Sequence, residues 1–177
     1  IPMHYVLKND KEHKLGTFPL MPGKARIFQE DNRGGEAFVG EDWGQFTPVD
    51  DEMKLYLGVA KDIVVRRTIE RNNKARVAGN LAHQDVIVKY EVENFKAAPI
   101  VLDISESLRA VRNETLGDTK RDPEWELGSE SNLPDPRDPD KSDAETVVFH
   151  VPLEARAGGG PAEKTVLKLH VLFKNEW

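Results

Sequence analysis

The sequence predicts an all-β protein: an antiparallel, immunoglobulin-like β-sandwich of about 8–10 strands, with a β-barrel as the alternative. Two observations support this fold class. Apolar and polar residues alternate with a period of two through most of the chain. The alternating stretches recur at regular intervals, and turns rich in glycine and proline separate them without intervening helical patterns.

The first expected strands form a hairpin over residues 24–29 and 36–39. The turn between them, EDNRGGEA, contains Asp, Asn and two glycines, which favour tight turns. The next strand is expected at residues 53–58, where Met53, Leu55 and Leu57 fall on one face.

Three consecutive strands are expected in the middle of the chain. Residues 61–71 are rich in β-branched side chains, and residues 84–95 alternate most clearly, with Tyr90 among the apolar positions. Residues 100–108 alternate again after a turn that contains Pro99.

The pattern weakens after residue 108, although residues 124–127 are expected to form a short strand. Residues 128–144 read as a Pro/Asp-rich loop, because proline cannot donate a hydrogen bond to a strand ladder. Residues 145–155 and 164–173 alternate again and are expected to pair as a closing hairpin.

Length and composition favour one globular domain over residues 1–177 and exclude several functions. The chain has 38% hydrophobic and 32% charged residues, so it can form a core. A net charge of −6 argues against nucleic acid and anionic lipid as partners, and no apolar run is long enough to insert in a membrane. The absence of cysteine excludes disulfides and thiol chemistry.

Four motifs, in order, resemble a bacterial C-terminal domain of unknown function that occurs in mucoidy inhibitor A-like and related envelope proteins. They are Pro-Gly-Lys at 22–24, Phe-Val-Gly-Glu-Asp at 38–42, Leu-Gly-x-Ala-x-Asp at 57–62 and Val-x-Asn-x-Lys-x-x-Pro at 92–99. The resemblance covers nearly the whole chain. It implies a β-sandwich at the C-terminal end of a longer, exported protein, located in the periplasm or cell envelope. It implies no activity, no cofactor and no site residues.

The stretch FVGEDWGQFTP sets Glu41 and Asp42 beside Trp43. Adjacent residues of a strand point to opposite faces, so the two carboxylates are not expected to converge on one substrate. A structural turn shaped by Gly40 and Gly44 is the favoured interpretation. A binding surface is the alternative, and it requires an exposed Trp43 ring.

The loop DPRDPDKSDAE supplies oxygen ligands of the kind that calcium prefers. The weak calcium candidates are Asp135, Asp138, Asp140 and Asp143. Their spacing does not match an EF-hand, and the prolines between them keep the segment extended. A solvated loop without a metal is therefore favoured.

A local basic concentration includes Arg66, Arg67 and Arg71 and is a second candidate binding surface, for an acidic partner or an anionic glycan. Protection of an exposed edge strand by charged side chains is the favoured interpretation.

No catalytic set is recognisable. The histidines lack zinc-site spacing, although His150 and His170 would lie near each other if the last two expected strands pair. No serine lies in a nucleophile elbow; Ser105 and Ser107 are expected to face solvent along a strand. The sequence therefore predicts a non-catalytic module without a cofactor, for protein interaction or structural support. Its partner would be another protein or another part of the parent chain. The alternative is a carbohydrate- or calcium-binding module.

Overall fold

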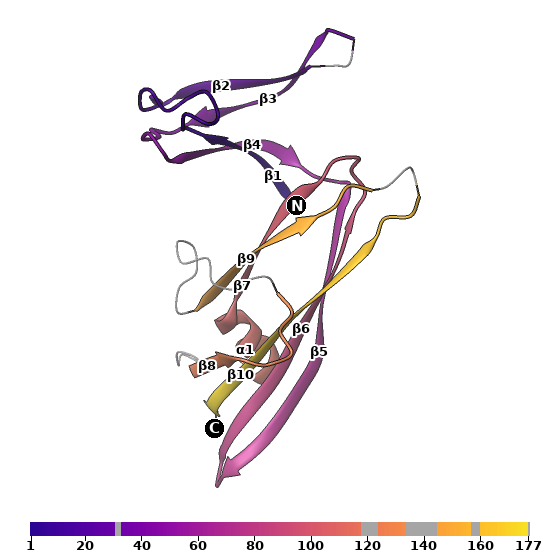
Figure 1. The fold of residues 1–177 in the computed structure, drawn as a ribbon. Coiled ribbons are helices and arrows are strands. Elements are labelled where there is room, and N and C mark those ends of the chain that lie inside the picture. The colour runs from indigo at the N-terminus through magenta and orange to yellow at the C-terminus, as the bar shows by residue number, and fades with distance from the viewer. Residues whose placement is uncertain (31–32, 118–123, 134–144, 157–159, 177) are drawn as a thin grey trace. The chain divides into compact units, whose positions relative to one another are not determined.

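The computed structural model describes residues 1–30, 33–117, 124–133, 145–156 and 160–176 (Figure 1). Ten strands and one helix form their regular structure, which confirms the predicted all-β class and the number of strands. The described sheets are antiparallel, and none of them closes into a barrel. The chain divides into two compact units, Ile1–Lys61 and Asp62–Trp177.

The elements in chain order are β1 (Pro2–Lys8), β2 (Gly23–Glu30), β3 (Glu36–Gly44), β4 (Glu52–Val59), β5 (Ile63–Ala78), β6 (Leu81–Asn94), β7 (Ile100–Ser107), α1 (Leu108–Leu116), β8 (Glu124–Leu127), β9 (Thr146–Leu153) and β10 (Lys164–Glu176). The expected hairpin is present as β2–β3, and the short strand at 124–127 is β8. Strand β1 and helix α1 were not predicted from the sequence. Of the predicted loop at 128–144, residues 134–144 lie outside the described part.

The first unit consists of two antiparallel ribbons, β1–β4 and β2–β3. Met53 and Leu55 of β4 are buried on one face of their ribbon, as the alternation predicts. Gly44 of β3 lies so close to Met53 that a Cβ atom there would be 2.6 Å from the sulfur. The two ribbons are therefore in direct contact, and a larger residue at position 44 would have to displace the Met53 side chain.

Asn9 joins the loops of the first unit. Its side chain is fully buried, and its amide nitrogen donates to the carbonyl groups of Phe18 and Pro48 at 3.1 and 2.9 Å. Its side-chain oxygen accepts the N–H of Gly16 at 2.9 Å. Because buried polar groups are costly without partners, this one side chain satisfies backbone groups from two separate loops.

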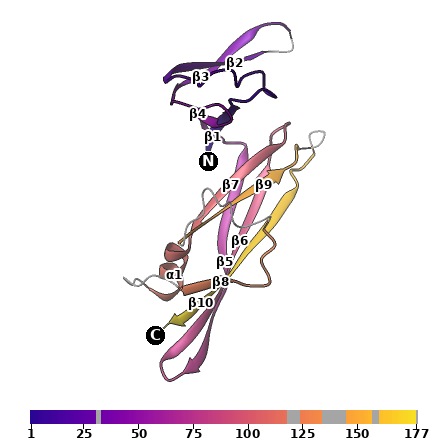
Figure 2. The same cartoon turned by 60° about the vertical axis from the view of Figure 1, so that its left-hand side comes forward.

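The second unit is a sandwich of two sheets (Figure 2). One sheet has the order β5-β6-β10-β8, and the other pairs β7 with β9. Apolar side chains from β6, β10, β7, β9 and α1 form one buried cluster between them. Its members are Val86, Val88, Tyr90, Val92, Leu102, Ile104, Leu108, Val111, Val147, Phe149, Val151, Leu153, Leu167, Leu169, Val171 and Phe173. Burial of these side chains is the main source of stability in this unit.

The pairing of the strands corrects one expectation. β9 and β10 do not form a hairpin with each other, because β9 pairs with β7 and β10 lies between β6 and β8. His150 and His170 therefore belong to different sheets. His150 contacts Asp103 of β7, whereas His170 contacts Asp85 of β6.

The helix α1 follows β7 directly. The side chain of Ser107 accepts the N–H of Ala110 as an N-cap, and Gly117 ends the helix with a positive φ. Leu108 and Val111 enter the core. Arg112 is buried and pairs with Glu176 at the end of β10, with one N–O distance of 2.5 Å. In the described part of the chain, no helix has the length and apolar composition needed to span a bilayer.

We expect Asn9→Ala to lower the free energy of unfolding of the first unit by about 2–3 kcal/mol, because the Gly16 N–H and two carbonyl groups lose their buried partner. Hydrogen exchange of the β4 amides measures this effect. Asn73→Ala, at an exposed position of β5, is the matched control and should leave exchange unchanged. Equal protection of β4 in Asn9→Ala and the native chain would contradict this role.

Candidate functional site

One exposed face of the β2–β3 ribbon carries an ordered set of aromatic and charged side chains, which we call the hairpin face. Its members are Lys24, Arg26 and Phe28 of β2 and Phe38, Glu41 and Trp43 of β3. They form three cross-strand pairs: Lys24 with Trp43, Arg26 with Glu41, and Phe28 with Phe38. Lys24, Arg26 and Phe28 share a face because every second residue of a strand does so. The bulge at Val39 brings Phe38 onto the same side as Glu41 and Trp43.

The Trp43 ring is open to solvent: the residue is 68% exposed. Phe28 and Phe38 are 53% and 57% exposed, and their rings meet edge to face at 5.6 Å. The binding interpretation of this stretch required an exposed Trp43. The favoured interpretation, a turn shaped by Gly40 and Gly44, is wrong, because both glycines lie within β3 and neither has a positive φ. The binding interpretation stays open and now includes Phe28 and Phe38.

The charged pairs of the hairpin face are held together on the surface. Glu41 accepts a hydrogen bond from Lys24 at 2.9 Å and a longer one from Arg26 at 3.4 Å. Lys24, followed by Arg26, lowers the pKa of Glu41. The ammonium of Lys24 also lies 5.9 Å from the centre of the Trp43 ring, within cation–π range. One carboxylate thus serves two cations, and the face keeps a surplus positive charge.

Asp42 points to the opposite side of β3. Its carboxylate accepts the backbone N–H of Tyr56 in β4 at 2.7 Å and that of Trp43 at 2.8 Å. These two bonds lower the pKa of Asp42, the Tyr56 bond more strongly. Glu41 and Asp42 therefore point apart, as predicted, and Asp42 connects the two ribbons.

The three arginines singled out from the sequence do not form one surface. β5 lies at the edge of its sheet, and Arg66 and Arg67 point to opposite faces of it. Glu70 is an extra, unpaired residue in the ladder, so the bulge moves Arg71 to the outer face with Arg66. Each arginine has a carboxylate partner, the nearest for Arg66 being Glu91 at 3.8 Å.

Arg67 faces the core side of the sheet. It pairs with Glu106 of β7 at 2.9 Å and with Glu114 of α1 at 2.9 Å. Burial alone would lower the pKa of Arg67, but the hydrogen bonds to these two carboxylates outweigh it and raise the pKa. Tyr90 also donates to Glu106, and burial, together with the charge of Glu106, raises the Tyr90 pKa. This group fastens α1 and β7 to the large sheet.

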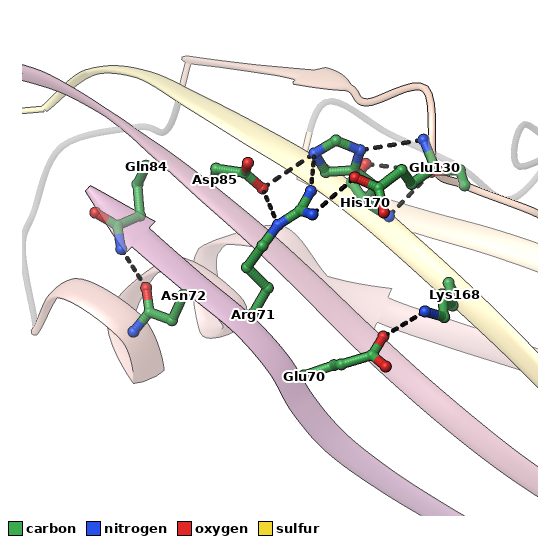
Figure 3. Close-up of polar contacts among 9 residues, drawn as sticks. Glu70, Arg71, Asn72, Gln84, Asp85, Glu130, Lys168 and His170 are labelled. Carbon is green, nitrogen blue, oxygen red and sulfur yellow. Dashed lines mark hydrogen bonds and ion pairs between the residues drawn. The ribbon is translucent and has the colours of Figure 1, made fainter. Parts of the chain in front are cut away.

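Arg71 belongs to a second group, the outer polar cluster, which comprises Arg71, Asp85, Glu130 and His170 (Figure 3). Arg71 binds Asp85 at 2.9 Å and Glu130 at 2.7 Å, and Glu130 contributes most to its raised pKa. His170 is only 5% exposed, and its Nε2 lies 3.1 Å from Asp85. The cluster joins three strands and the segment after β8.

Protein groups contact both ring nitrogens of His170. Its Nδ1 accepts the backbone N–H of Glu130 at 3.2 Å, and its Nε2 lies 3.1 Å from the Asp85 carboxylate and 3.2 Å from the Arg71 guanidinium. Both ring nitrogens are thus occupied by protein groups. This arrangement suits a structural clamp and leaves the ring no free nitrogen for a substrate or a metal.

Gly128 lies directly against this ring. A Cβ atom at position 128 would overlap Nδ1 and the neighbouring ring atoms of His170. The backbone of the same segment is bonded to β10, through the Gly128 N–H to the His170 carbonyl at 2.9 Å. No local sequence pattern predicts this contact, because Gly128 and His170 lie on segments far apart in the chain.

Among the described residues, no group of three or more His, Cys, Asp or Glu side chains is arranged to hold a metal ion. The calcium candidates Asp135, Asp138, Asp140 and Asp143 lie outside the described residues. Ser105 and Ser107 are exposed, as predicted, and Ser107 serves as the cap of α1. Tyr90 is buried as expected, whereas Tyr56 is 44% exposed.

We expect Gly128→Ala to destabilise the second unit by about 1–3 kcal/mol, because the added methyl group displaces the His170 ring. Hydrogen exchange of the β10 and Glu130 amides measures the loss. Gly23→Ala is the control, since no atom lies within 4 Å of a Cβ there. In a His170→Ala background the same glycine substitution should cost less, and an undiminished cost would contradict the proposed overlap.

Asp42→Asn should speed hydrogen exchange at Tyr56, because an amide offers one acceptor oxygen where the carboxylate offers two. The folded pKa of Asp42 lies below its ordinary value of 3.8. Its stabilising effect is therefore present above about pH 4 and is lost as the pH falls through the folded pKa. The difference from the native chain should shrink in acid, and a pH-independent difference would count against this linkage. Glu36→Gln, near the start of β3, is the control.

Comparison with known proteins gives no relative: no family model, no curated protein and no solved structure matches this chain.

Proposed function

We propose that this chain is a non-catalytic β-sandwich module that binds a protein, or another part of its parent protein, through the hairpin face. The exposed Trp43 carries the proposal, together with the exposed pair Phe28 and Phe38 on the same side of the ribbon. Exposed groups of large apolar side chains mark interaction surfaces, and Trp and Arg are frequent energetic centres of protein interfaces.

The arrangement of ionisable groups supports binding over catalysis. The buried histidine, His170, has both ring nitrogens bonded within the outer polar cluster. Glu106 is bonded to Arg67 and Tyr90 inside the sandwich. A general base needs a free position near a substrate, and these groups are occupied in holding strands together.

The sequence resemblance supports the setting of this module. It points to a β-sandwich within a larger exported bacterial protein of the periplasm or cell envelope. In that setting the module would provide interaction or structural support.

A carbohydrate-binding function is the second candidate, and the exposed Trp43 ring favours it as well. Sugars bind best on flat aromatic platforms, whereas the rings of Phe28 and Phe38 are inclined by 64° to each other. An uneven surface with a central charged pair fits protein side chains better. Calcium binding at Asp135, Asp138, Asp140 and Asp143 stays a prediction.

Photo-crosslinking in an extract of the source cells tests the proposal. A benzoylphenylalanine placed at Phe38 should form a discrete protein adduct, and adding Trp43→Ala should abolish that adduct. The control position is Val101, an exposed apolar residue of β7 in the second unit. Equal adducts at both positions, or an adduct that ignores Trp43, would refute the proposed role of the hairpin face.

A further inference from the structure

We propose that the hairpin face of one chain binds the same face of a second copy, about a twofold axis that runs parallel to β2 and β3. This inference rests on the proposed function and names the partner. It follows from the order of the three cross-strand pairs on the face: Lys24 with Trp43, Arg26 with Glu41, and Phe28 with Phe38.

The two side chains of each pair would also attract each other if they belonged to different copies of the chain. A twofold axis parallel to the strands and midway between them exchanges the positions of β2 and β3 when the two faces meet. Arg26 of one copy then lies over Glu41 of the other, and Glu41 lies over Arg26. The same operation sets Lys24 over Trp43 and Phe28 over Phe38. Every contact is therefore cation to carboxylate, cation to aromatic ring, or ring to ring.

The other in-plane twofold axis gives no such match. An axis perpendicular to the strands through the middle row would place Arg26 over Arg26 and Glu41 over Glu41. Like charges in direct contact oppose association. The charge pattern therefore selects the arrangement in which β2 of one copy runs parallel to β2 of the other. The twist of the ribbons then sets the usual angle of about 30° between aligned sheets.

Each face carries two cations and one carboxylate, so the two facing surfaces share a positive surplus that limits their affinity. Glu41 is bonded to Lys24 and Arg26 within its own chain, and in the dimer it also lies over Arg26 of the other copy. The alternating residues are about 7 Å apart along each strand, so the three rows span roughly 14 Å. A face of three rows on two strands buries less than the roughly 800 Å² per partner of a standard interface, so we expect weak, micromolar association.

A charge-exchange experiment with the full chain tests the inference by sedimentation over a wide range of concentrations. The native chain should dimerise reversibly. Glu41→Arg alone and Arg26→Glu alone should each raise the dissociation constant about tenfold or more, because each sets like charges opposite each other across the axis. A mixture of the two variants should associate again, since position 26 of each variant then faces an opposite charge at position 41 of the other.

Trp43→Ala provides a second test that adds no charge. It should also weaken the dimer while leaving the ladder between β2 and β3 intact, as hydrogen exchange of the β2 and β3 amides would verify. A native chain that stays monomeric at every concentration, or variants whose mixture fails to associate while both are folded, would overturn the inference. If photo-crosslinking at Phe38 then yields a different protein in a Trp43-dependent manner, the proposed function stands without self-association.

Discussion

The carboxylate of Asp42 accepts two backbone N–H groups, and this interaction determines which side of β3 is covered. Because its Tyr56 bond reaches β4, Asp42 must face the β1–β4 ribbon. Its neighbours Glu41 and Trp43 must then face away, since successive side chains of a strand alternate. The position of the candidate site is thus a geometric consequence of one structural contact. An acidic pair that suggests catalysis in the sequence is divided between a structural and a surface role.

The strands could be predicted from the sequence because their signal is local. Alternation in β4 and β6 identified Met53, Leu55 and Tyr90 as core positions, and all three are buried. The pairing of strands could not be predicted in the same way. β10 lies between β6 and β8, and β9 pairs with β7, so the closing hairpin expected from chain order is absent. Only the shared core between the sheets selects this arrangement. The helix α1 had local signals in its Ser107 cap and Gly117, but its polar residues concealed them.

The candidate site could be predicted only in part. The stretch around Trp43 was found from its residue types, yet the exposure of the ring depends on how the ribbons pack. Lys24, Arg26, Phe28 and Phe38 were missed as site residues, because only the hairpin register brings them beside Trp43. The candidate surface of Arg66, Arg67 and Arg71 is not formed, for a different reason. The bulge at Glu70 reverses the alternation, so Arg71 faces Asp85 on the outer side whereas Arg67 faces Glu106 in the sandwich.

The distribution of charge over the two units explains why the hairpin face is the better binding surface. In the second unit, Arg67 and Arg71 are each held by two carboxylates, so a partner would have to break existing ion pairs to use them. On the hairpin face the ratio is reversed, since one carboxylate, Glu41, serves two cations. A contact there adds interactions without removing any, and it covers aromatic rings that are already exposed to water. A small surface of this kind binds weakly by itself, and it becomes effective where other contacts raise the local concentration of its partner.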